Sequence, residues 1–170
     1  MNPMRQIRIE KITLNVGAGK EQSKLEKGIV LLKSITGVDP VKTFTSKRIP
    51  SWGLRPGLPI GCKITLRGEQ ANELLKRLLQ ARDNALKITQ FDNNGNVSFG
   101  IHEYIDIPGV KYDPQIKVMG LEACITLGRN GFRIKKRRIK ARKIHRNHAI
   151  TKEEAIAFMK DQFSVIIGEE

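Results

Sequence analysis

The sequence predicts a single α+β domain, in which a mainly antiparallel sheet packs with helices and a long basic loop precedes the C-terminal helix. Segments with alternating apolar and polar residues are interspersed with segments whose apolar residues recur at helical spacing, which favours this class. The 170 residues, 39% of them apolar, are enough for one substantial core. Neither a domain boundary nor a repeat of solenoid length is evident in the chain.

The first expected strand spans residues 7–16. Its alternation of apolar residues shifts phase after Ile9 and resumes at Ile12, which predicts a β-bulge near Glu10 and Lys11. Beyond the bulge the polar residues of this strand share one face, because side chains alternate along a strand.

Four further elements are expected in the first half of the chain. Apolar residues at helical spacing predict a helix over residues 21–36, which ends at Gly37. Short alternations predict strands over residues 41–44 and 62–67, and a leucine-rich stripe predicts a helix over residues 69–82.

The second half predicts a hairpin and one long strand. Residues 88–91 and 97–101 have strand character and flank an Asn-Gly pair at 94–95, which is a strong hairpin signal. Residues 116–127 alternate again and predict a strand that is interrupted near Gly120. The order of elements is therefore that of an α+β fold.

Two segments are expected to project from this framework. Three prolines and two glycines in residues 45–60 predict a long loop, and loops of this length are usually functional or disordered. Residues 129–149 form a basic insertion before a C-terminal helix, whose start is marked by the capping box of Thr151 and Glu154.

The composition indicates a polyanionic partner. Lys and Arg number 31 against 17 Asp and Glu, which gives a formal net charge of +14 and a pI near 10.1. Nucleic acid is the obvious candidate, and the apolar runs are too short for a membrane span. Two distant cysteines and no secretory signal favour a reducing cytoplasm.

Much of the positive charge lies in the basic insertion. From Ala123 to Lys152 the chain has eleven Lys and Arg and no Asp or Glu. A solvated basic face or a disordered tail is the alternative, but the position between a strand and a helix favours an internal loop that contacts phosphates. The expected RNA-binding residues here are Arg133, Lys135, Lys136, Arg137, Arg138, Lys140, Arg142 and Lys143.

No motif indicates catalysis, a cofactor or a metal. A P-loop, a Rossmann glycine motif and paired catalytic carboxylates are missing from the sequence. His145 and His148 alone are too few ligands for a zinc site. His102 and Glu103 are adjacent, so in a strand they point to opposite faces, and structural roles are expected.

Four ordered motifs carry a resemblance that covers nearly the whole chain. The sequence resembles the universal L-five family of large-subunit ribosomal proteins, and two further segments, GRNGF and ITKEEA at residues 128–132 and 150–155, resemble its archaeal and eukaryotic branch. The four motifs are ITLNVGAG at residues 12–19, LRPGLPIGCKITLRG at 54–68, GNVSFGIHEYID at 95–106 and KYDPQI at 111–116.

The resemblance implies a structural role in the large ribosomal subunit, with 5S rRNA, large-subunit rRNA and neighbouring ribosomal proteins as partners. Asn15 and Thr65 match family positions that contact 5S rRNA. Some members have Gln after the Thr-Gly that ends the first helix, whereas this chain has Val38, which removes one side-chain hydrogen bond.

The loop at residues 45–60 matches the family segment that reaches toward the P-site tRNA. Its expected tip contains the chain's single tryptophan, which would either stack on a base or pack against its own domain. The tip residues are Arg48, Ser51, Trp52, Gly53, Leu54 and Arg55.

RNA duplexes are recognised mainly through phosphates, 2′-hydroxyls and shape, which suits lysine, arginine and short polar side chains. If strands 7–16 and 62–67 are neighbours, their polar faces form one surface. Threonine is also common on any exposed strand face, so the threonines alone would not indicate RNA. The expected surface residues are Lys11, Thr13, Asn15, Lys63, Thr65 and Arg67.

Two other functional classes remain open from the sequence. An RNA-processing or RNA-modifying enzyme would use His102 and Glu103 as its catalytic pair. A general nucleic-acid architectural protein would bind through the basic segment alone and would not distinguish 5S rRNA from duplex DNA.

Overall fold

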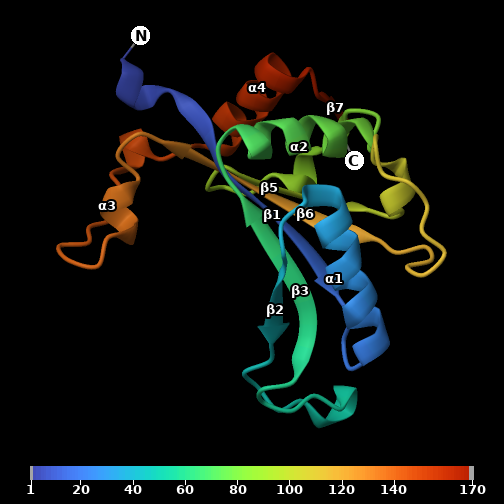
Figure 1. The fold of residues 1–170 in the computed structure, drawn as a ribbon. Helices are drawn as coiled ribbons and strands as arrows, with labels where there is room; N and C mark the ends of the chain where they lie inside the picture. The colour runs from blue at the N-terminus through green and yellow to red at the C-terminus, as the bar shows by residue number, and fades with distance from the viewer. Residues whose placement is uncertain (1, 169–170) are drawn as a thin grey trace.

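The computed structural model describes residues 2–168 and confirms the α+β class (Figure 1). A five-stranded sheet has the order β2-β3-β1-β6-β5, and each pair of neighbours is antiparallel. A small parallel pair, β4 with β7, lies apart from it. The strands are β1 (Ile7–Gly17), β2 (Val41–Phe44), β3 (Pro59–Leu66), β4 (Ala85–Lys87), β5 (Asn96–Ile101), β6 (Leu121–Arg129) and β7 (Ile166–Gly168).

Three longer helices cover one face of the main sheet, and a fourth, very short helix lies in the basic insertion (Figure 1). The predicted stop at Gly37 is confirmed, since this residue caps the first helix with a φ of 71°. The capping box of Thr151 and Glu154 is confirmed as well. The helices are α1 (Gln22–Thr36), α2 (Glu69–Gln80), α3 (Arg133–Lys136) and α4 (Lys152–Phe163).

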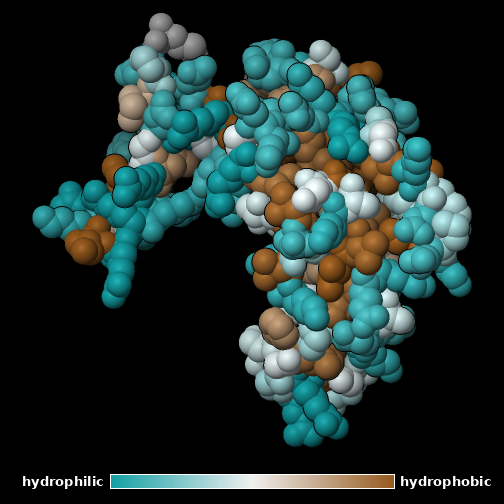
Figure 2. Space-filling model, viewed as in Figure 1, coloured by the Kyte–Doolittle hydropathy of each residue, from teal (hydrophilic) through white to brown (hydrophobic). Residues whose placement is uncertain are grey.

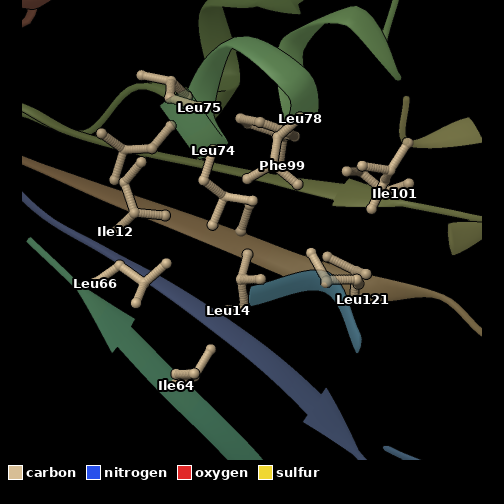
Figure 3. Packing of buried hydrophobic residues seen from close by; sticks show 14 of the residues in the cluster. Ile12, Leu14, Ile64, Leu66, Leu74, Leu75, Leu78, Phe99, Ile101 and Leu121 are labelled. Atoms are coloured by element: carbon tan, nitrogen blue, oxygen red, sulfur yellow. The ribbon is translucent and has the colours of Figure 1, made fainter. Parts of the chain in front are cut away.

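The core lies between the sheet and these helices. Leu74 and Leu78 of α2 pack over Ile12, Leu14 and neighbouring strand residues, as Figure 3 shows. Burying each such side chain contributes roughly 1.5–3 kcal/mol, so this layer supplies much of the stability. The remaining face of the sheet is lined by polar side chains, and no helix within the described residues covers it.

The predicted bulge in β1 is confirmed. The register of β1 against β6 shifts between Ile9 and Lys11, and the alternation of buried residues changes phase there. On the other side, β1 pairs with β3 from Ile12 onward. The strand thus keeps apolar residues toward the helices along its whole length while it bends at the bulge.

The first arm of the predicted hairpin is wrong. Residues 88–90 form a 3-10 helix instead of a strand, and only Phe91 makes a bridge to Val97 of β5. Local hydrogen bonds hold this segment: the Gln90 side-chain oxygen accepts from the backbone N–H of Lys87 at 2.9 Å, and the Ile88 carbonyl accepts from the N–H of Phe91 at 3.3 Å. These bonds engage backbone groups that a first arm of the hairpin would have used in the sheet.

The strand predicted over residues 116–127 begins later than expected. The Asp113 carbonyl accepts from the N–H groups of Ile116 and Lys117, both at 3.1 Å, and Lys117 has a φ of 63°. This turn holds residues 113–118 out of the sheet, and β6 begins at Leu121. The short strands β4 and β7 were not predicted.

Candidate nucleic-acid interface

The open face of the sheet carries a row of small polar side chains. Thr13 of β1 is opposite Thr65 of β3 on one side and Cys124 of β6 on the other, and Cys124 is opposite Ser98 of β5. The two threonine hydroxyls are 3.4 Å apart. Because all four side chains are short, a nucleic-acid backbone can approach this row closely.

Charged residues flank the row on the same face. Asn15 pairs with Lys63 and with Glu122, and Lys11 pairs with Thr126. The prediction that the first strand and the strand at 62–67 are neighbours is therefore confirmed. We call this surface the open sheet face; its residues are Arg8, Lys11, Thr13, Asn15, Lys63, Thr65, Asn96, Ser98, Glu122, Cys124 and Thr126. The predicted Arg67 lies directly after the end of β3 and has no partner in the sheet.

Sequence reasoning missed six residues of this face, namely Arg8 and those of β5 and β6. Arg8 belongs to it because it pairs with Gly128, two residues beyond Thr126 on β6. Burial and the nearby Glu122 carboxylate raise the pKa of the Cys124 thiol, so this side chain is neutral at physiological pH. The alternation in β5 and β6 was visible in the sequence, but their place beside β1 was not.

The loop predicted over residues 45–60 ends at residue 58, because β3 begins at Pro59, earlier than the expected residue 62. It extends the β2–β3 hairpin away from the body of the protein (Figure 1). Backbone bonds from Thr45 to Leu58 and from Gly57 to Thr45, at 3.0 and 2.9 Å, hold its two arms together. At the tip, Leu54 is buried, whereas 67% of Trp52 is exposed. Trp52 therefore does not pack into its own domain, and Leu54 supports the tip from inside.

The basic insertion is fixed at its base by Arg129, the last residue of β6. Arg129 is only 6% exposed, and its guanidinium donates to the carbonyls of His148 and Ala149 at 3.3 and 3.2 Å. It also forms an ion pair with Glu154 of α4 at 2.7 Å. Both ends of the insertion are thus tied to the start of α4.

The two histidines of the insertion make local contacts. The His148 ring lies 2.9 Å from the Asn130 carbonyl through Nε2 and packs edge-on against Phe132, with ring centroids 5.7 Å apart. His145 Nδ1 accepts from the N–H of Asn147 at 3.3 Å. These contacts give both imidazoles structural roles at the end of the insertion.

Glu154 has a shifted pKa that reflects this network. Burial would raise the pKa of its carboxyl group, but hydrogen bonds from the Thr151 backbone and the Arg129 guanidinium, together with the Arg129 charge, outweigh burial. The pKa therefore lies below its usual value, and the ion pair is intact at neutral pH.

The predicted cations of the insertion are all exposed and project from one side of the molecule (Figure 2). Lys136 forms an ion pair with Glu10 at the bulge of β1, and the Arg137 side chain donates to the Lys140 carbonyl at 2.8 Å. The structure does not bring these cations onto the open sheet face as one patch. The exposed set is Arg133, Lys135, Lys136, Arg137, Arg138, Lys140, Arg142 and Lys143.

Comparisons with known proteins agree with the resemblance. A profile of the C-terminal part of the ribosomal L5 family matches residues 59–158, and one described as ribosomal protein L5 matches residues 2–55. The chain belongs to the ribosomal protein L5 family. Similar proteins include two that are named large ribosomal subunit protein uL5. The one from Nanoarchaeum equitans is 50% identical over 98% of both chains. The one from Sulfurisphaera tokodaii is 46% identical over 99% of this chain and 96% of the relative.

The L5 motifs recognised in the sequence lie on the elements that build the open face and its supports. ITLNVGAG forms the second half of β1 and the turn into α1, and LRPGLPIGCKITLRG runs from the loop tip through β3. GNVSFGIHEYID contains β5. KYDPQI is the turn at Asp113, whose N–H donates to the Tyr104 hydroxyl at 2.9 Å. Val38, the departure from some members of the L5 family, is exposed directly after α1.

Within residues 2–168, none of the helices combines the length and apolar character needed to cross a membrane.

Proposed function

We propose that this chain is a structural protein of the large ribosomal subunit, working in the cytoplasm, that binds 5S rRNA and helps to attach it to the large-subunit rRNA in the central protuberance. The loop at residues 45–60 contacts the P-site tRNA. The role is binding and not catalysis.

The open sheet face is the observation that carries this proposal. A face without a covering helix, with short hydroxyl and amide groups in its centre and Lys11 and Lys63 around them, matches the chemistry of an RNA backbone. Asn15 and Thr65, which match RNA-contacting positions of the family, lie on this face. Charge would supply affinity, and the short side chains would supply the fit.

The two projecting segments support the other partners. The insertion presents cations away from the open sheet face, so it can engage a second RNA segment while the face holds 5S rRNA. The hairpin loop holds Trp52 exposed at its tip, where a base or a sugar can stack on it. Arg48, Ser51, Gly53 and Arg55 surround the tryptophan in sequence.

The experiment that tests the proposal is a salt titration of binding to 5S rRNA, transfer RNA and duplex DNA of similar size. A preference for 5S rRNA that persists as salt rises is expected, because fit to shape depends less on salt than phosphate contacts do. Equal and steeply salt-dependent binding to all three would favour the architectural alternative instead. RNA turnover that is lost in a His102→Ala variant would favour the enzyme.

A further inference from the structure

A small pocket lies where the insertion meets the end of the open sheet face. It has a volume of about 270 Å³, and its wall is formed by β1, the end of β6 and α3. Four cationic residues line it: Arg8, Arg129, Arg133 and Lys136. One carboxylate, Glu10, lines it as well.

The charges around this pocket are only partly compensated. Lys136 pairs with Glu10, and Arg129 pairs with Glu154. Arg8 and Arg133 form no ion pair with any carboxylate among residues 2–168. The pocket therefore keeps an excess of two positive charges, which favours an anionic ligand.

The Arg129 side chain does not add to this excess. Arg129 pairs with Ile7, so it points to the helix side of the sheet, where its guanidinium bonds the His148 and Ala149 carbonyls and Glu154. Arg8, which pairs with Gly128, lies on the opposite side, and Arg8 and Arg133 therefore carry the unpaired charge of the pocket.

The pocket continues the open sheet face. Arg8 pairs with Gly128, and both line the pocket; the next polar pair along the strands is Lys11 with Thr126. Gly128 has no side chain to fill the space beneath the insertion. An RNA backbone that runs along β1 and β6 from Thr13 and Cys124 would reach this pocket at the end of the sheet.

We propose that the pocket binds one phosphodiester group of the RNA that lies along the open sheet face. The guanidinium groups of Arg8 and Arg133 hold the phosphate oxygens from the strand and from the insertion, in the forked geometry that suits phosphate. This site rests on the proposed function and adds Arg8 to it. It also lets Arg133, at the base of the insertion, contact the RNA that lies on the open sheet face, while the other cations of the insertion project away from it.

The test compares Arg8→Gln with Lys24→Gln, a control that removes one charge from exposed α1 outside the proposed surface. Arg8→Gln is expected to weaken 5S rRNA binding about tenfold and to reduce the slope of log K against log salt by about one, as for the loss of one phosphate contact. Lys24→Gln should change neither the affinity for 5S rRNA nor the salt slope strongly. Arg8→Lys keeps the charge but loses the forked guanidinium, so its affinity for 5S rRNA should lie between those of the wild type and Arg8→Gln.

A double-variant cycle asks whether Arg8 and Arg133 share one ligand. If they do, Arg133→Gln weakens binding less in the Arg8→Gln background than in the wild type. Arg138→Gln, in the same insertion but outside the pocket, should have the same effect in both backgrounds. Additive effects of Arg8 and Arg133 would overturn the shared phosphate.

The remaining outcomes separate the pocket from the proposed function. If the wild type prefers 5S rRNA but Arg8→Gln behaves as Lys24→Gln, the pocket assignment is wrong and the function stands. If the wild type shows no preference for 5S rRNA, the function itself fails. Thermal melting in inorganic phosphate distinguishes a third case: stabilisation that depends on Arg8, with unchanged RNA binding, would make free phosphate the ligand and overturn the RNA assignment.

Discussion

Arg129 joins three parts of the molecule through one side chain. It ends β6, and its guanidinium reaches the carbonyls at the end of the insertion and the carboxylate of Glu154 on α4. In the sequence it was one cation among eleven in a basic stretch. Nothing local distinguishes it from its exposed neighbours, because its burial depends on where α4 packs.

Removing this side chain should destabilise the protein. Arg129→Met leaves two partly buried carbonyls and Glu154 without their donor, so we expect the free energy of unfolding to fall by about 1–3 kcal/mol. Urea denaturation followed by circular dichroism measures this change. Arg133→Met, at an exposed position four residues later, is the matched control; an equal loss in both would show that Arg129 is not a structural anchor.

The depressed pKa of Glu154 predicts the pH dependence of stability. Its folded-state pKa lies below the unfolded value of 4.5, so the carboxylate contributes stability that is complete above pH 4.5 and is lost as the pH falls through the folded-state pKa. We expect the stability advantage of the wild type over Glu154→Gln to shrink as the pH is lowered from 6 to about 3, as urea titrations would reveal. An advantage that stays constant over this range would contradict the ion pair.

At the scale of elements, the sequence predicted the long amphipathic segments best. β1 with its bulge, α1, α2 and the capped start of α4 are confirmed near the expected positions because each carries its own periodic signal. The failures at residues 88–90 and 116–118 arise where the Gln90 side chain and nearby backbone carbonyls accept hydrogen bonds from local N–H groups. The strands β4 and β7 have three residues each, too few for a period to be visible.

Two glycines of the main sheet offer a matched test of packing. A Cβ added at Gly61 of β3 would lie 2.7 Å from the Val16 carbonyl oxygen, whereas one at Gly100 of β5 would meet nothing within 4 Å. Gly61→Ala should cost about 1–3 kcal/mol of stability through forced backbone movement, and Gly100→Ala should be close to neutral. Thermal melting compares them; equal melting temperatures would contradict the close approach of β1 and β3.

The exposed cations of the insertion predict a nonspecific electrostatic contribution. Neutralising Arg137, Arg138 and Lys140 together should weaken binding to every RNA tested and flatten its salt dependence by up to about three units of slope. The preference for 5S rRNA over transfer RNA should largely remain, because the open sheet face is untouched. Loss of the preference with an unchanged slope would assign the specificity to the insertion.

At the scale of the whole molecule, the candidate site depends on which strands are neighbours. The residues contributed by β1 and β3 could be predicted once their pairing was assumed, and the structure places them together. Cys124, Ser98 and Arg8 were missed because pairing between β1 and β6 joins residues more than one hundred positions apart. A single sequence contains no local signal for such a contact.

The open sheet face can be tested as a unit with the protein otherwise intact. Asn15→Ala combined with Thr65→Ala should reduce the preference for 5S rRNA while leaving the melting temperature and weak nonspecific binding nearly unchanged, because both side chains lie on the solvent side of the sheet. Competition binding against transfer RNA measures the preference. Retained preference in a folded double variant would remove this face from the proposed interface.

The position of β1 in the centre of the sheet also has a consequence for how the chain is made. β1 is translated first, and β3 can join it early, but its other neighbour, β6, begins only at Leu121. At typical synthesis rates of about 5–20 residues per second, β1 waits on the order of ten seconds before that edge is closed. During this interval the nascent cationic chain exposes the unpaired edge of β1. The yield of folded protein should therefore depend on chaperones or on early binding to RNA, even if the finished protein is stable.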